Sequence, residues 1–494
     1  MPGRFAAYPN HALDQMRILP KRLLYALVMM AICLGCERPV AERQPGEKSL
    51  PSVATIRQPH ASESSTRSSP VSSAATPFEQ FGTREQDTGV AGLESLGAAI
   101  GDARVVLLGE SSHGVAEFAV QRERIIRYLH EQEGFSVLAL EAPMYDCDAA
   151  GRREAKFDAA SALMYCAFPV WTVSEVEPLF RYLRERATTD RPIRLAGFDV
   201  QLMGTQGSVY RPAYLRQMIE RVDPRFAREI FESDSSLLAR AIDAQGAGRD
   251  FRLSELEARD RSVRYGRLRD WLARNDKALA RAAVSDHDRH VVRQLARSGE
   301  FTLNILKSTT AQAANVRDEG MAANLDFLMD SLYPTERIIV WAHNEHIRYG
   351  GADSFLGEQF GQPSMSMFRR MGNWLRSRRG ELYSVGFFMR RGYHRLNDGQ
   401  VLAVSSPRRE SLEERFGRSG LRLAFVDLRK LDQSPPAQAF RSPMTSFVWG
   451  AVEKRLVLSD EYDGLLLVDS VGPSRRLRQP RRAPCCPKRT TGKP

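Results

Sequence analysis

The chain has 494 residues, of which 43% are hydrophobic, and a formal net charge of +11. This length can bury the core of one large domain with an insertion, or of two ordinary domains. The segment from Ser474 to the end holds eight Lys and Arg and no acid, so residues 91–473 are nearly neutral. A nearly neutral body lacks the basic surface of a nucleic-acid-binding protein, and we exclude that class of partner.

Residues 1–36 predict an export signal of the lipoprotein type. Basic residues within 17–22 precede the apolar run LLYALVMMAICLG, which is too short for a membrane span. Met16 is an alternative start, because the residues before it add nothing that such a signal needs. The run ends at Gly35 and Cys36, and Cys36 resembles the lipidated cysteine of a bacterial lipobox; an ordinary cleaved signal is the alternative. We therefore expect an exported protein that is periplasmic or held at a membrane of the cell envelope by a lipid on Cys36.

Residues 37–88 predict a flexible linker. They are rich in Ser, Thr and Pro, as in PHASESSTRSSPVSSAATP, and show no apolar periodicity. The basic residues 473–494 predict a disordered tail. Because disulfides persist outside the cytoplasm, Cys147 and Cys166 are a candidate disulfide pair, and two separate thiols are the equal alternative.

Residues 89–472 predict one α/β domain with a mainly parallel sheet flanked by helices. Short runs of Val, Leu and Ile without polar alternation indicate strands that are covered on both faces. An amphipathic helix over 116–132 follows the first strand, and helical pattern follows most of the others. Strand patterns are absent over 210–312, where we expect a largely helical insertion that acts as a lid or as scaffold. The predicted strands span 103–109, 135–142, 193–200, 337–343, 382–389, 421–428 and 463–470.

Reactive side chains follow the ends of several predicted strands. Glu110 and His113 come directly after the first strand, in LLGESSHG, and Glu141 closes the second. His343 and His346 end the fourth strand, in WAHNEH. Because ligands of open α/β sheets bind beyond the carboxyl ends of the strands, we expect these side chains to share one site.

The loop after the first strand does not match a serine nucleophile. A nucleophile elbow needs G-x-S-x-G between a strand and a helix, whereas the stretch from Gly109 to Gly114 has one residue too many. We expect Ser111 and Ser112 to cap the helix that follows.

The residues alone leave two interpretations of this site open. In the first, one carboxylate and three imidazoles hold a divalent metal, although the H-E-x-x-H helix of zinc proteases is absent. The ligands would be Glu110, His113, His343 and His346. In the second interpretation no metal takes part, and His113 acts as general base. Glu110 or Glu141 would then orient the base, and Arg122 would supply a cation for the oxyanion.

Six sequence blocks follow one another between about residue 89 and residue 390 of the chain. They are LLGESSHGVAEFAVQRERIIRYLHEQEGFSVLALEA, Trp171 with SEVEPLFRYLR, GFDVQ, RDEGMAANLDFL, IIVWAHNEHI and LYSVGFF. In order and spacing these blocks resemble the erythromycin esterase family.

The resemblance implies that water hydrolyses a macrolide lactone without a required metal. It implies a small-molecule ester or lactone as partner, and macrolide resistance as an outcome. His113 would be the base, with Glu110 and Glu141 as the carboxylates of the catalytic set. Three further side chains would bind substrate or stabilise the oxyanion: Arg122, His343 and His346. The alternatives are a metal-dependent hydrolase and an envelope protein related to polysaccharide production that uses the same cleft.

Overall fold

The computed structural model describes residues 78–80, 92–152, 157–350 and 369–477. Within these ranges the strands are β1 (Glu79–Gln80), β2 (Val105–Leu108), β3 (Phe135–Pro143), β4 (Arg194–Asp199), β5 (Arg337–Trp341), β6 (Leu382–Arg395), β7 (Val401–Ala403), β8 (Leu423–Asp427), β9 (Met444–Val448), β10 (Val452–Leu456) and β11 (Gly464–Val471). In the described part of the chain, one nine-stranded sheet has the order β1-β8-β11-β6-β2-β5-β3-β4, with β7 on β6. The strands β9 and β10 pair separately as a hairpin.

The six strands from β11 to β4 in this order are parallel to one another. Antiparallel pairs occur where β8 joins β11, β1 joins β8 and β7 joins β6. The strand β2 lies inside the parallel part, and all four of its apolar residues are buried, as expected for a strand covered on both faces. The prediction of an α/β domain with a mainly parallel sheet is therefore confirmed.

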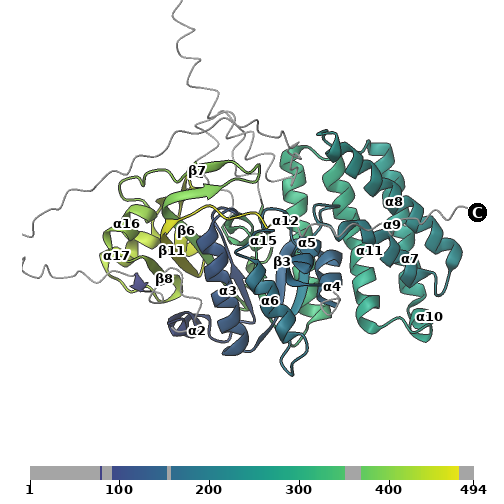
Figure 1. Ribbon diagram of the computed structural model, residues 1–494, viewed down its shortest axis with the longest axis horizontal. Helices are drawn as coiled ribbons and strands as arrows, with labels where there is room; N and C mark the ends of the chain where they lie inside the picture. The colour runs from purple at the N-terminus through teal and green to yellow at the C-terminus, as the bar shows by residue number, and fades with distance from the viewer. Residues whose placement is uncertain (1–77, 81–91, 153–156, 351–368, 478–494) are drawn as a thin grey trace, which may run out of the picture.

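Helices cover the sheet and extend beyond its β4 edge (Figure 1). The helices α11 (Asp286–Lys307) and α12 (Thr310–Phe327) pack against each other, and α12 also contacts β4, so the helical part predicted over 210–312 stands beside this edge. Several of its helices begin with a side-chain cap, as at Ser254, whose hydroxyl and Glu257 form a capping box. The helices around the sheet are α2 (Glu94–Ile100), α3 (Ala116–Glu131), α4 (Met144–Arg152), α5 (Ala159–Cys166), α6 (Glu177–Arg186), α12 (Thr310–Phe327), α13 (Asn344–Ile347), α15 (Met371–Trp374), α16 (Leu412–Arg418), α17 (Pro435–Gln438) and α18 (Leu458–Glu461). The helical part contains α7 (Arg211–Ile219), α8 (Pro224–Gly246), α9 (Glu255–Arg274), α10 (Asp276–Arg281) and α11 (Asp286–Lys307).

A disulfide bond joins Cys147 in α4 to Cys166 at the end of α5. This is the pair that the sequence offered as a candidate. The bond ties together two helices beside β4, because α4 packs against β4 and α5 packs against α4.

Both predicted boundaries of the domain differ from the packing. Phe78 is part of the hydrophobic core and β1 pairs with β8, so ordered chain is present inside the predicted linker 37–88. At the other end, the backbone N–H of Ser474 donates to the carbonyl of Gly114 over 3.0 Å, so the first residues of the predicted tail 473–494 are packed. Cys36 and the predicted export signal lie outside the described residues. In the described ranges, none of the helices is long and apolar enough to cross a membrane.

Candidate active site

The GESSHG loop leaves the carboxyl end of β2 near the middle of the sheet. A Cβ atom on Gly109 would lie 2.0 Å from Oδ1 of Asn344, and one on Gly114 would lie 1.9 Å from the carbonyl oxygen of Arg395. Both contacts are too close for any side chain, so glycine lets the loop pass between α13 and β6.

The two serines of this loop do not cap α3, contrary to the prediction. The N-cap residue of α3 is Val115, which makes no side-chain capping bond. Ser112 Oγ lies 2.9 Å from Nδ1 of His394 instead, and both residues are buried. Ser111 Oγ is buried without a hydrogen-bond partner among the described residues. Ser112 thus ties the loop to His394, Ser111 makes no side-chain hydrogen bond to the described residues, and neither serine caps α3.

Glu110 and His113 form a close pair. His113 Nδ1 donates to Oε1 of Glu110 over 2.7 Å, because a carboxylate can only accept. The neutral imidazole therefore carries its lone pair on Nε2, which is the basic nitrogen. Trp171 Nε1 donates to the same Oε1 over 2.7 Å, and Arg122 Nη2 lies 2.6 Å from Oε2. Three partners hold the buried carboxylate, and the carboxylate holds the base.

Arg122 lies behind Glu110 rather than facing open space. Its Nε and Nη2 donate to the carbonyl of Gly109 over 2.9 and 2.7 Å, and its guanidinium lies 4.3 Å from the centre of the Trp341 ring. Burial lowers the pKa of Arg122, and the charge of Glu110 opposes this shift. The helix α3 thus brings Arg122 to the site, as a partner of the carboxylate and of the loop backbone.

His343 lies beside the base and is held as a hydrogen-bond donor. The centres of the His113 and His343 rings are 4.9 Å apart. The backbone N–H of Glu345 donates to His343 Nδ1 over 3.2 Å, so the ring proton of neutral His343 is on Nε2. Burial and then the neighbouring charge of His113 keep the pKa of His343 well below its usual value. Its Nε2 is buried and has no hydrogen-bond partner in the described part of the chain.

Glu141 connects the end of β3 to the loop that carries His343. Its Oε2 accepts the backbone N–H of His343 over 2.9 Å, and its Oε1 lies 2.6 Å from Arg317 Nη2 and 3.2 Å from His346 Nε2. Burial alone would raise the pKa of Glu141, but the charges of His346 and Arg317 hold it well below the usual value. Arg317 also binds Asp199 at the end of β4, with 2.5 Å between Nη2 and Oδ2.

His346 is buried, and both of its ring nitrogens are engaged. Its Nδ1 lies 2.7 Å from Oδ1 of Asp318, opposite the contact with Glu141. Burial disfavours the charged ring, yet the charges of Asp318 and Glu141 raise the pKa of His346 to about 10. His346 therefore contacts Glu141, while the ring of His343 lies beside the base.

The four residues considered as metal ligands do not converge. His346 is occupied by two carboxylates, and Glu110 by Arg122, Trp171 and His113. Across the residues that the structure describes, no group of three or more His, Cys, Asp and Glu could hold a metal ion. The donor set of the metal interpretation thus does not fit a metal ion, and we derive no step through one.

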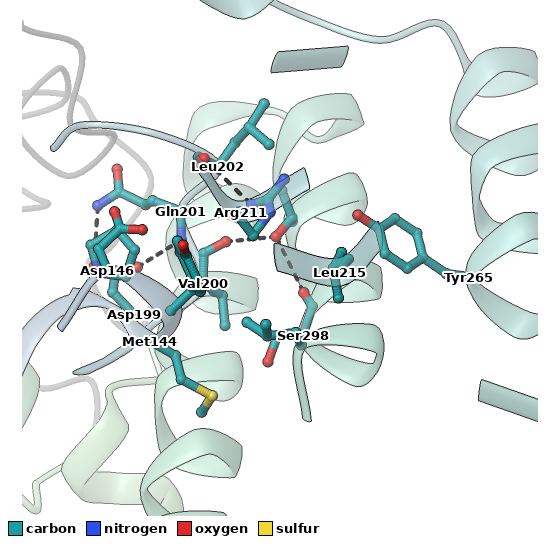
Figure 2. A pocket seen from close by; sticks show the side chains of 15 residues that line it. Met144, Asp146, Asp199, Val200, Gln201, Leu202, Arg211, Leu215, Tyr265 and Ser298 are labelled. Atoms are coloured by element: carbon teal, nitrogen blue, oxygen red, sulfur yellow. Dashed lines mark hydrogen bonds between the residues drawn. The ribbon is translucent and has the colours of Figure 1, made fainter. Parts of the chain in front are cut away.

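A small cavity adjoins the site on its β4 side (Figure 2). Asp199 lines it and also binds Arg317, so the cavity and the charged network share this carboxylate. Asp146 accepts a hydrogen bond from Ser208 Oγ over 2.7 Å, and burial raises the pKa of Asp146 to about 6. The other side of the cavity comes from the helical part and includes Arg211, Leu215, Tyr265, Leu295 and Ser298.

Sequence reasoning missed several residues that shape this site. Arg317 and Asp318 come from α12, far from the strand ends in sequence, and Trp449 comes from the turn after β9. The sequence did contain a local signal for Arg317 and Asp318. They are adjacent opposite charges in VRDEGMAANL, where small and apolar residues follow them. Trp171, Arg317 and Asp318 all lie in the sequence blocks that resemble the family, but the sequence predicted no role for them.

The model of the family described as erythromycin esterase matches residues 130–471. The chain belongs to the erythromycin esterase family. The resemblance drawn from the sequence blocks is confirmed, and the match extends past residue 390 to include β9, β10 and β11. Glu141, His343 and His346 lie inside the matched range, whereas Glu110 and His113 precede it.

Two relatives place this member among hydrolases. The chain is 26% identical over 391 residues to YbfO of Bacillus subtilis strain 168, named as a candidate hydrolase, covering 75% of this chain and 84% of YbfO. It is 30% identical over 287 residues to erythromycin esterase type I of Escherichia coli, covering 54% of this chain and 66% of that enzyme. The family is thus one of hydrolases, and its members include erythromycin esterase.

Solved structures share the fold of this erythromycin esterase family member. A Bacillus cereus protein aligns with a TM-score of 0.66 at 19% identity, over 81% of this chain and 97% of the other. A succinoglycan biosynthesis protein aligns with a TM-score of 0.65 at 16% identity, over 81% and 96%. A mutant of the erythromycin esterase EreC in its open conformation aligns with a TM-score of 0.62 at 21% identity, over 80% and 98%.

Proposed function

We propose that this protein hydrolyses a carboxylic ester or lactone by direct attack of water, with His113 as the general base. One observation carries the proposal: a base and a hydrogen-bond donor lie side by side at the end of the central strand. His113 has its Nδ1 fixed by Glu110 and its Nε2 basic. The ring of His343 lies 4.9 Å away between centres, and its Nε2–H has no partner among the described residues. A general base and an oxyanion donor both accelerate the hydrolysis of an ester by water.

The reaction follows from this arrangement. His113 Nε2 takes a proton from water while the water oxygen attacks the carbonyl carbon, and the carbonyl π electrons move to oxygen. Glu110 stabilises the imidazolium that forms, as an oriented carboxylate does in related acid–base pairs. The Nε2–H of His343 donates to the new oxyanion. When the tetrahedral intermediate collapses, the carbon–oxygen bond to the leaving group breaks, and His113 returns its proton to the departing alkoxide.

The mechanism proposed here uses no metal. His343 is a neutral donor because burial and His113 keep its pKa low. A neutral imidazole donor meets the oxyanion without placing a second positive charge beside His113 when it becomes protonated. Glu141 serves this step by accepting the backbone N–H of His343.

For substrate we propose a macrolide lactone, and macrolide resistance as the consequence. The support is family membership and the similarity to a relative named erythromycin esterase type I. An acylated envelope polysaccharide is the second candidate, since a protein named for succinoglycan biosynthesis shares the fold.

We further propose that the protein is exported and anchored at the cell envelope through lipid on Cys36. The mass of the mature N-terminal peptide tests this: a diacyl or triacyl Cys36 supports it, and an unmodified peptide starting elsewhere contradicts it.

The experiment is a hydrolysis screen with purified protein. The panel holds 14-membered macrolides, simple aryl and alkyl esters and an acetylated polysaccharide, and products are read by mass spectrometry. We expect ring-opened macrolide carrying one added water, with activity retained after chelation of divalent metals. His113→Ala should lose activity, whereas the control His290→Ala, in a partly exposed residue of α11, should not. Absence of product across the panel, or loss of activity on chelation, contradicts the proposal.

A further inference from the structure

The hairpin of β9 and β10 lies outside the main sheet but reaches the catalytic loop. Its strands pair antiparallel, and the turn between them begins at Trp449. The backbone N–H of Trp449 donates to the carbonyl of Ser111 over 2.8 Å. The proposed mechanism assigns no step to a residue of this hairpin. The sequence did not predict a functional role for any of these residues either.

Trp449 has an uncommon backbone conformation. Its φ is 54°, in the left-handed region that bulky aromatic residues rarely adopt. Such a conformation persists only where the surroundings impose it, and it is enriched at functional sites. Here the surroundings are catalytic: the indole stacks on His343, with 4.5 Å between ring centres and 18° between planes. It also meets the ring of His113 in a T-shaped contact, with centres 5.0 Å apart.

The same hairpin also acts on His343 indirectly, through Glu345. Lys454 on β10 is buried, and its ammonium forms an ion pair with Glu345. The backbone N–H of Glu345 is the donor that occupies His343 Nδ1 and so keeps the proton on Nε2. Arg348 Nε lies 3.3 Å from the same carboxylate oxygen of Glu345, and Arg370 Nη2 lies 3.8 Å from it. Trp449 thus covers one face of the imidazole, and Lys454 holds the residue that sets its tautomer.

We propose that the β9–β10 hairpin positions His343 for catalysis, with Trp449 and Lys454 as the positioning residues. They act through His343: they keep its Nε2–H directed at the oxyanion that forms beside His113. An imidazole free to rotate or exchange tautomers would present Nε2 as an acceptor for part of the time, and catalytic donors must be held in place before the reaction. The inference deepens the proposed function and rests on it.

The first test is a double-mutant cycle on the full chain, with the best ester from the screen as substrate. We expect Trp449→Leu to lower kcat by about tenfold or more with little change in KM, since it removes a contact needed in the transition state. Trp449→Phe keeps an aromatic face and should recover most of kcat. Combined with His343→Asn, Trp449→Leu should cause little further loss, because both act on one group. Trp271→Leu, in α9 against Phe226, is the matched control and should leave kcat unchanged.

The second test does not need turnover. ¹⁵N NMR of protein labelled with ¹⁵N-histidine shows which ring nitrogen of His343 carries the proton. The spectrum of His343→Asn assigns the signals of His343. We expect one tautomer, protonated at Nε2, in the wild type, and a mixture in Trp449→Leu and Lys454→Met. If the wild type hydrolyses no ester, the proposed function fails, and this measurement still decides the positioning.

Three results overturn the inference. One is a single unchanged tautomer in Trp449→Leu and Lys454→Met. Another is wild-type kcat in Trp449→Leu. The third is a double variant with His343→Asn whose loss equals the two single losses multiplied. Should Trp449→Leu fail to fold, Lys454→Met carries the same comparisons.

Discussion

Arg317→Met removes a cation that lies between two buried carboxylates. Arg317 Nη2 lies 2.6 Å from Glu141 and 2.5 Å from Asp199, and all three side chains are buried. Glu141 keeps His346 as a partner, whereas Asp199 keeps only its hydrogen bonds with Gln201 among the described contacts. Removing one partner of a buried pair costs about 3–5 kcal/mol, because the other charge stays desolvated. We expect a loss of about this size near pH 8.

The pH dependence of this loss has a definite sign. Without Arg317, Glu141 loses one of the charges that hold its folded-state pKa low, so this pKa rises toward its unfolded value. In the wild type, the stability that comes from the depressed pKa of Glu141 is present above about pH 4.5 and is lost as pH falls, so the deficit of Arg317→Met shrinks on going from about pH 8 to about pH 3. Adding Asp199→Asn to Arg317→Met should restore part of the loss, since it removes the carboxylate left without a cation.

Urea unfolding at the two pH values, followed by tryptophan fluorescence, measures these differences. The matched control is Arg267→Met, whose side chain and that of its partner Glu229 are 54% and 38% exposed. An exposed pair of this kind contributes about 0–1 kcal/mol. A loss below about 1 kcal/mol for Arg317→Met, or a deficit equally large at both pH values, would refute the reasoning.

Three further predictions concern the site and its support. Glu110→Gln should lower kcat by about 10²–10⁴-fold, because an amide no longer fixes the tautomer of the base or stabilises its charge; steady-state kinetics showing more than a tenth of wild-type kcat would contradict this. The stability advantage of the wild type over His346→Gln should be full below about pH 6.5 and lost as pH rises through about 10, since the folded pKa is raised; a pH-independent difference in urea midpoints would be inconsistent with it. Reducing the disulfide between Cys147 and Cys166, separated by 19 residues, should lower the free energy of unfolding by about 3 kcal/mol, and equal midpoints with and without reductant would argue against it.

The sheet was predictable because its central strands can be recognised from local sequence alone. Val105 to Leu108 are apolar without alternation, which only a doubly covered strand tolerates. The rule that parallel strands end at one edge then brought Glu110, Glu141 and His343 to one site. The antiparallel direction of β8 was not visible, since the apolar run LRLAFVDL reads alike in a parallel and an antiparallel pair.

The partners of the catalytic groups were less predictable, because they come from distant elements. Asp318 meets His346 from α12, and His394 meets Ser112 because β6 runs to Arg395, beyond the predicted end at residue 389. Trp449 lies in a hairpin turn with Trp-Gly in the left-handed conformation, whereas the pattern that predicts such turns is Asn-Gly or Asp-Gly. These contacts depend on packing between elements rather than on local pattern.

In the proposed mechanism, His113 activates water for attack on an ester carbonyl. The most direct test of this step compares kcat of His113→Ala with that of the wild type, on the best substrate from the screen and with folding checked by circular dichroism. General bases contribute about 10²–10⁴-fold, and we predict a loss of that size. A folded His113→Ala variant that keeps a substantial fraction of wild-type kcat would contradict the claim.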